Sequence, residues 1–267
     1  MRSSFERIVL CLLLGMGIVA VHADERGDAL ARQVYDRPDG ADLTAAGTME
    51  LAEPDREPRV RRFVTYRLDQ GGGETRSLIR FIEPADIRGT GLLTVDRVRS
   101  DADQWVYLPA LDRSRRIPAA RKGGRFVASD LYFEDMQDRM PDEDVHRWLR
   151  DDSISGKPVE VIESVPVDPG SSVYSKRISW IDPVMLLPMR VDYFRPGGGE
   201  PFKRLTVQQV ERIQGYWTVT ESTMQDLETG HRTRMLMERT VYDRGLPRDL
   251  FSVQVLEDVA REEAYRP

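Results

Sequence analysis

Basic side chains are concentrated between residues 113 and 125, where six of them occur without an acidic residue. These six residues are Arg113, Arg115, Arg116, Arg121, Lys122 and Arg125. Because the whole chain has a formal net charge of −6, this run is a local positive patch on an acidic protein. Such a patch can contact anionic lipid head groups or an acidic partner. A solvated hairpin is the alternative interpretation.

Three carboxylates, Asp130, Glu134 and Asp135, follow the basic run at close spacing. Paired carboxylates can divide the roles of general acid and general base. However, Ser129 or Asp130 before LYFEDM also fits a helix N-cap with a glutamate in the first turn. We favour capping, and we expect a helix-like segment here.

Motifs for catalysis are missing from the sequence. Beyond residue 23 the histidines are His146 and His231, which are far apart, and His231 lies in the turn-like TGHRT. There is no G-x-S-x-G, no H-E-x-x-H and no phosphate-binding loop. We therefore expect no enzyme, no catalytic residue, no metal site and no cofactor. A lipid hydrolase would need a nucleophile and a base that these patterns do not supply.

Several expected strands carry large apolar side chains on both faces. Val106 and Leu108 alternate with Trp105 and Tyr107, for example, and Met235 and Met237 flank Leu236. Burial on both faces requires a covering layer on each side of a sheet or a filled interior. Methionine also adapts to apolar ligands of varied shape. Ordinary core packing and a lipid-sized hollow both fit this pattern.

The elements that position these residues are short strands. We count about eleven of them at roughly ten-residue spacing, joined by Gly, Pro and Asp turns, which is typical of an all-β sandwich or barrel. One of them is expected at residues 115–119, residues 145–153 are ambiguous between helix and strand, and residues 28–36 predict a helix. Its apolar stripe is thin and includes Ala29, Leu30 and Val34.

Residues 1–23 are expected to be a cleaved signal peptide, which leaves residues 24–267 as a single domain. Arg2 and Arg7 precede an apolar run over residues 8–21, and the sequence Val-His-Ala at 21–23 fits a small-residue cleavage site. The single cysteine, Cys11, lies inside the apolar run and follows a leucine, so we do not expect lipid anchoring. Disulfides and thiol chemistry are then excluded from the mature chain.

Composition indicates a globular protein that does not bind nucleic acid. Of 267 residues, 40% are hydrophobic and 31% are charged, which suits a packed core beneath a solvated surface. A nucleic-acid-binding domain would normally be basic overall or carry a long basic stripe. The acidic balance of this chain argues against that class.

An ordered series of short motifs resembles a known family. QWVYLPAL, RSRRI and SDLYFEDM are followed by YSKRISWID, LLPMRVDYF, GYWTV, TGHRT and GLPRDLF. This series is similar to the uncharacterised outer membrane lipoprotein-sorting proteins, relatives of the LolA and LolB carriers. It covers most of the chain after residue 75. The resemblance implies a mainly β fold, an incomplete antiparallel β-barrel covered by short helices, with an apolar hollow between them.

The same resemblance implies a soluble periplasmic carrier of lipid or lipoprotein acyl chains. Contact with a membrane surface and an inner-membrane exporter of the resistance-nodulation-division (RND) type are implied as partners. A periplasmic sensor that binds a membrane protein's periplasmic domain is the alternative. Under the carrier hypothesis, nine apolar residues line the hollow. They are Ile79, Phe81, Leu93, Trp105, Tyr107, Ile178, Trp180, Met235 and Met237.

Overall fold

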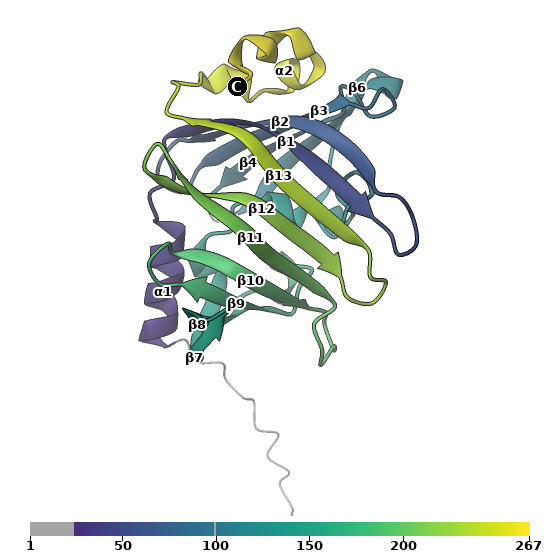
Figure 1. Cartoon of the computed structure of the whole chain (residues 1–267). Helices are drawn as coiled ribbons and strands as arrows, with labels where there is room; N and C mark the ends of the chain where they lie inside the picture. Colours follow the sequence, from purple (N-terminus) through teal and green to yellow (C-terminus); the bar gives the residue numbers. More distant parts are fainter. Residues whose placement is uncertain (1–23, 99) are drawn as a thin grey trace, which may run out of the picture.

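The computed structural model describes residues 24–98 and 100–267. The expected signal peptide and Cys11 lie outside these residues. Thirteen strands of the described residues form one antiparallel sheet in the order β6-β5-β4-β3-β2-β1-β13-β12-β11-β10-β9-β8-β7 (Figure 1). The two ends of this order do not pair, so the sheet curves without closing. The expected fold, a mainly β incomplete antiparallel barrel, is confirmed.

The first seven strands are β1 (Asp42–Ala52), β2 (Arg59–Asp69), β3 (Thr75–Glu83), β4 (Gly91–Arg97), β5 (Ser100–Leu108), β6 (Arg113–Arg116) and β7 (Asp144–Ile154). The other six are β8 (Lys157–Pro166), β9 (Lys176–Asp182), β10 (Leu187–Phe194), β11 (Lys203–Ile213), β12 (Tyr216–Asp226) and β13 (Arg232–Tyr242). The helices are α1 (Glu25–Tyr35) and α2 (Val253–Glu257), with short 3₁₀ turns between strands.

The structure corrects the bounds of one expected strand and resolves one ambiguous segment. The strand expected at residues 115–119 is β6, which ends at Arg116, because the proline at 118 cannot donate a hydrogen bond to a neighbouring strand. The ambiguous residues 145–153 belong to β7, an edge strand paired only with β8. The side chains of β7 are largely exposed after Trp148, so the strand lacks the clear alternation of a half-buried strand.

The sheet has two covered faces, which we call inner and outer. On β2 and β3 the inner face carries Phe63, Ile79 and Phe81, all of them buried. The outer face carries Tyr66 and Leu78 at alternate positions. Burial on both faces, expected from the apolar residues of the central strands, is therefore confirmed for this half of the sheet.

The C-terminal segment, residues 246–267, covers the outer face above β1 to β5 (Figure 1). Phe251 and Leu256 of this segment are buried against Tyr66 and Leu78. A fully buried ion pair joins the two layers, because the Arg80 side chain bonds to both carboxylate oxygens of Glu262 at 3.1–3.3 Å. The guanidinium of Arg80 also donates to three backbone carbonyls, so its charge is compensated.

The connection between β6 and β7 spans the inner face. These strands follow one another in the chain but form opposite edges of the sheet, so residues 117–143, the crossing segment, must pass from one edge to the other. It contains 3₁₀ turns and no α-helix. The helix-like segment expected after Ser129 is therefore limited to the 3₁₀ turn Glu134–Met136, and no α-helix forms there. Phe126 of this segment is fully buried beside Phe81.

Candidate functional site

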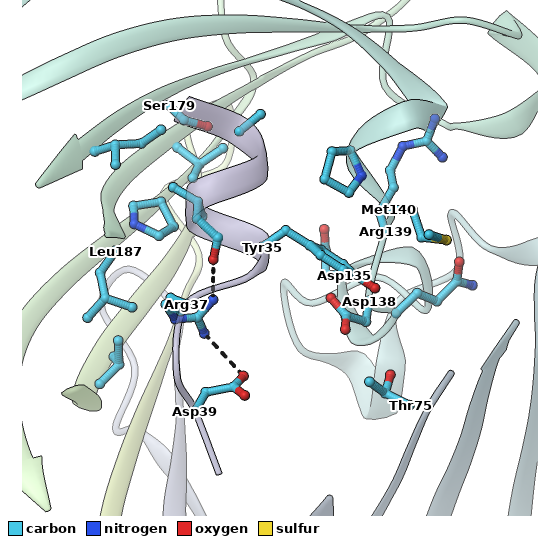
Figure 2. A pocket seen from close by; sticks show the side chains of 18 of the residues that line it. Tyr35, Arg37, Asp39, Thr75, Asp135, Asp138, Arg139, Met140, Ser179 and Leu187 are labelled. Carbon is cyan, nitrogen blue, oxygen red and sulfur yellow. Dashed lines mark hydrogen bonds and ion pairs between the residues drawn. The ribbon is translucent and has the colours of Figure 1, made fainter. Parts of the chain in front are cut away.

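A cavity of about 670 Å³ lies between α1, the crossing segment and the inner face (Figure 2). Its apolar lining comes largely from α1 and from strands β8 to β13. This lining includes Val34, Ile162, Ile181, Leu187, Trp217 and Met237. Its polar lining comes largely from β3, β4 and the crossing segment. This lining includes Thr75, Ser77, Asp96, Gln137, Asp138 and Arg139. The cavity is therefore amphipathic.

Helix α1 forms one wall of the cavity because its N-terminus is fixed on β7. Asp24 caps the helix through Oδ1, which accepts from the Gly27 amide at 2.5 Å, while Oδ2 accepts from the Trp148 amide of β7 at 2.7 Å. A Cβ atom on Gly27 would lie 2.7 Å from the Trp148 nitrogen, so only glycine permits this approach. Leu30 and Ala31 are buried in the contact with β8 and β9. Ala29, expected in the stripe, is exposed.

The charged side chains that follow the C-terminus of α1 pair with one another and with Arg67 of β2. The Asp39 carboxylate lies 3.0 Å from Arg67 and 3.8 Å from Arg37, and the Arg37 side chain also donates to the Val34 carbonyl at 2.9 Å (Figure 2). Tyr35, at the end of α1, also lines the cavity. Burial raises the pKa of its hydroxyl to about 12. Tyr35 is therefore a neutral hydrogen-bonding group at physiological pH.

Asp96 is the most perturbed carboxyl group in the cavity wall. It is 6% exposed, and burial raises its pKa to about 7. Hydrogen bonds from the Thr75 hydroxyl, at 2.9 Å, and from the Asp138 backbone oppose this rise in pKa, and the charge of the Asp138 carboxylate adds to it. Asp96 was not among the expected site residues, because a polar residue in the sequence TVDR looks like an ordinary solvent-facing position of a strand.

A buried lysine attaches the crossing segment to β11. The Lys203 ammonium bonds to the Asp135 carboxylate at 2.5 Å and lies 3.8 Å from the ring centre of Tyr132. The rings of Tyr174 and Tyr193 lie 4.8 and 4.9 Å from the same ammonium. Burial lowers the pKa of Lys203, and Asp135 opposes that change. This arrangement replaces water around the charge with a counter-ion and three aromatic faces.

Asp130 and His231 lie together, although they are far apart in sequence. His231 Nδ1 donates to Asp130 Oδ2 at 2.5 Å, and the Thr233 hydroxyl donates to the same oxygen at 2.8 Å. The expected capping role of Asp130 is therefore wrong, and His231 is more than a turn residue. Among the described residues, no hydroxyl or thiol is hydrogen-bonded to the other ring nitrogen of His231. The pair connects the crossing segment to β13.

The other two residues of the expected carboxylate group also attach the crossing segment. Glu134 accepts from the Ser172 hydroxyl and from the Val173 amide, the latter at 2.7 Å. The Asp135 carboxylate accepts from the Tyr174 hydroxyl at 2.7 Å in addition to its bond with Lys203. Each carboxylate thus has a separate partner on a neighbouring loop or strand, and no two of them form an acid–base pair.

His146 lines the cavity, with both ring nitrogens engaged. Nε2 donates to the Pro141 carbonyl at 2.8 Å, and Nδ1 lies 2.9 Å from the Ser164 hydroxyl. His146 therefore holds the end of the crossing segment against β8. In the described part of the chain, no group of three or more His, Cys, Asp or Glu side chains is arranged to hold a metal ion.

The nine apolar residues expected to line a hollow do not share one space. Ile79, Phe81 and Met235 belong to or pack on the inner-face cluster around Phe126. Leu93, Trp105 and Tyr107 lie on the outer face beneath the C-terminal segment. Ile178 and Trp180 pack on the outer side of β9. Met237 lines the cavity.

The six basic residues differ in how far they are engaged. Arg116 bonds to Asp103, Arg125 bonds to Asp226 at 2.6 Å, and the Lys122 ammonium donates to the Gly170 carbonyl at 3.1 Å. Arg113, Arg115 and Arg121 are exposed, and none of them forms an ion pair within the described residues. Three residues of the patch therefore bond within the protein, and the other three are exposed and can contact a partner.

Comparison with known proteins assigns the architecture to a family. The model of a family described only as "uncharacterized protein" matches residues 73–258, more than half of the chain. No curated protein matches. No helix of residues 24–98 and 100–267 is long and apolar enough to span a membrane.

Three solved structures share the fold. The crystal structure named as an outer membrane lipoprotein-sorting protein domain from Vibrio parahaemolyticus is 28% identical, with a TM-score of 0.83, over 87% of this chain and 99% of that one. A DUF1329 family protein from Desulfovibrio piger is 29% identical, with a TM-score of 0.81, over 88% and 99%. A LolA superfamily protein from Nitrosomonas europaea is 20% identical, with a TM-score of 0.67, over 85% and 97%.

Proposed function

The chain belongs to the LolA-like family of uncharacterised outer membrane lipoprotein-sorting proteins, and on this premise we propose that it binds an acyl chain in the cavity beside α1 and carries it between membranes. The cargo is a lipid or the anchor of a lipoprotein. The observation that carries this proposal is the volume of the cavity, about 670 Å³, with an apolar lining over β8 to β13. Ligand pockets commonly measure about 300–1,000 Å³.

Hydrophobic transfer provides a large gross contribution to binding. A chain of about 16 carbons, at about 0.8 kcal/mol per buried CH₂, contributes roughly 12 kcal/mol before the costs of binding. A bilayer offers the same favourable free energy of burial. A carrier must therefore bury the acyl chain incompletely if it is to release its cargo. The polar lining around Asp96 and Gln137 supports such a role, because a chain in this cavity cannot contact apolar groups on every side.

The place of action follows from the family and the N-terminal sequence. We propose the periplasm, with export directed by residues 1–23. A membrane protein would deliver or receive the cargo, and an RND-type exporter is the partner implied by the resemblance. We propose a role without catalysis, because the bonds from His231 and Thr233 to Asp130 Oδ2 give Asp130 and His231 a structural role as attachments of the crossing segment.

Filling the cavity is expected to displace the cargo. Ser179 lines the cavity from β9, so in Ser179→Phe the added ring occupies the space of the acyl chain. We expect at least a tenfold loss of bound lipid, measured by organic extraction and lipid mass spectrometry of the purified protein. Circular dichroism checks that the fold persists.

The adjacent residue provides a matched control. Ile178 lies on the opposite side of β9, where it packs against Trp180 and its neighbours, so Ile178→Phe places the same phenyl ring outside the cavity. We expect this variant to retain lipid as the wild type does. Equal lipid content in both variants would refute the assignment of the cavity.

The decisive first measurement is native mass spectrometry of the protein purified from a Gram-negative periplasm. A bound, extractable acyl species supports the carrier and identifies the class of cargo. A protein that stays empty after incubation with phospholipid vesicles or an acylated peptide contradicts the proposal. A stable complex with a membrane protein's periplasmic domain, without lipid, would then favour the sensor alternative.

A further inference from the structure

The hairpin of β5 and β6 carries apolar and basic side chains on one face. In the antiparallel register Val106 lies opposite Arg115, and Leu108 lies opposite Arg113. Residues directly opposite one another project to the same side of a sheet. Two apolar and two basic side chains therefore alternate over a few ångströms, on the face turned away from Trp105, Tyr107 and the C-terminal segment.

A second groove, of about 560 Å³, opens beside this face. Its apolar lining consists of Val106, Leu108, Ile117, Pro118, Ala120 and Phe133. Arg115, Arg121 and Arg116, the last of them paired with Asp103, also line the groove. The groove is separate from the cavity beside α1, because the crossing segment lies between them, with Phe133 lining the groove and Asp135 to Pro141 lining the cavity.

The charge on this surface is available for a partner. Arg113, Arg115 and Arg121 have no ion pair among the described residues, and no acidic residue interrupts residues 113–125. The acidic side chains beside the hairpin have other partners: Asp103 pairs with Arg97 and Arg116, Asp112 accepts from the Tyr107 hydroxyl at 3.0 Å, and Glu257 of α2 accepts from the Ser114 amide at 3.0 Å. At the tip of the hairpin, Leu111 is 48% exposed.

We propose that this surface, formed by Arg113, Arg115, Arg121, Leu111 and the groove, docks the protein onto a bilayer of anionic phospholipid. Guanidinium groups bind phosphate oxygens in a bidentate manner, and Leu111 and the groove contact the acyl boundary below the head groups. Charge complementarity selects this occupant, because the free groups are cationic while the rest of the chain is acidic. Docking here is independent of cargo in the cavity.

The test is co-sedimentation with vesicles. The purified wild-type protein is expected to bind vesicles of mixed phosphatidylglycerol and phosphatidylcholine at low salt, to bind vesicles of phosphatidylcholine alone much less, and to dissociate at high salt. The triple variant Arg113→Gln/Arg115→Gln/Arg121→Gln is expected to bind the anionic vesicles about 100-fold more weakly, because each arginine near an anionic surface contributes a factor of several.

The matched control removes the same charge elsewhere. Arg232→Gln/Arg239→Gln/Arg248→Gln changes exposed arginines of β13 and the following turn, and this variant is expected to bind nearly as the wild type does. Leu111→Ser is expected to weaken binding without changing its salt dependence. Ser179→Phe is expected to bind vesicles normally, so failure of docking and failure of the cavity assignment are distinguishable.

Three outcomes would overturn the proposal. The first is a wild-type protein that does not bind anionic vesicles, which would leave the surface to an acidic protein partner. The second is equal loss of binding in both triple variants, which would reduce the effect to net charge. The third is unchanged vesicle binding by Arg113→Gln/Arg115→Gln/Arg121→Gln together with its self-association on size-exclusion chromatography. This result would show that the arginines only prevent the edge strand β6 from pairing with another chain.

Discussion

At the scale of single residues, the polar groups beneath the sheet differ in how they are compensated. Lys203 has a counter-ion and three aromatic rings around it, and His231 and Asp130 bond to one another. Asp96 accepts from the Thr75 hydroxyl and from the Asp138 backbone, and it lies beside the Asp138 carboxylate. Burial without a cationic partner favours the neutral form of a carboxyl group, so Asp96 retains its proton up to about pH 7.

This difference predicts a pH dependence of stability. Because burial raises the pKa of Asp96 from 3.8 to about 7, the folded state binds a proton that the unfolded state has lost across that interval. The stabilisation is complete below about pH 4 and is lost as the pH rises through about 7, by at most about 4 kcal/mol at about 1.4 kcal/mol per unit. In Asp96→Asn this component should be absent. Urea denaturation at a series of pH values measures it.

The test compares how steeply the free energy of unfolding changes with pH in the wild type and in Asp96→Asn. The wild-type free energy of unfolding should fall more steeply between pH 4 and pH 8 than that of Asp96→Asn, on the order of a few kcal/mol over the interval. Thr75→Val, which removes the hydroxyl donor, should move the midpoint to higher pH. Parallel curves for the wild type and Asp96→Asn would exclude Asp96 as the titrating group.

At the scale of elements, the crossing segment decides what the inner face can contain. Phe126 fills the space above Phe81, so that end of the face is solid core. Residues 135–141 of the same segment leave the cavity beside α1 open. Side-chain bonds from Asp130, Glu134 and Asp135 hold the segment in this position, where regular secondary structure is absent.

Loss of one attachment should therefore destabilise the protein strongly. Lys203→Met leaves the Asp135 carboxylate buried without its counter-ion, for which the expected cost is about 3–5 kcal/mol. The double variant Lys203→Met/Asp135→Asn should recover part of this loss, because the uncompensated charge is gone. Urea denaturation followed by circular dichroism measures the free energies, and the double-mutant cycle isolates the interaction.

An exposed lysine serves as the control for that substitution. Lys157 lies at the start of β8, and Lys157→Met should change the free energy of unfolding by less than about 0.5 kcal/mol. If Lys203→Met were no more destabilising than Lys157→Met, the buried pair would not hold the crossing segment in place.

At the scale of the whole molecule, a single continuous sheet carries both covered faces. Its central strands β1 and β13 have hydrogen-bonded neighbours on both sides, whereas β6 has four residues and one neighbour. Hydrogen exchange should follow this gradient, with the slowest amide exchange in β1, β2 and β13 and the fastest in β6. Exchange measured by mass spectrometry checks it, and slow exchange in β6 would indicate that another chain covers this edge.

Patterns among residues that are close together in the sequence determined much of the fold. Alternating apolar positions and turn residues are local signals, so the sequence alone predicted most strands and the mainly β architecture. The order of motifs supplied the family. Local signals also predicted a helix-like segment after Ser129, where the structure has a 3₁₀ turn at Glu134–Met136 and no longer helix, because tertiary bonds from Asp130 and Asp135 compete with capping in that segment.

Only the tertiary structure decided which apolar residues face the cavity. Period-two alternation shows that Trp105 and Val106 point to opposite sides of a strand, yet it cannot say which side is the inner one. That choice depends on the C-terminal segment, which covers the outer face from residues far away in sequence. For the same reason Asp130 meets His231, and β6 and β7 take opposite edges of the sheet, through contacts that no local pattern encodes.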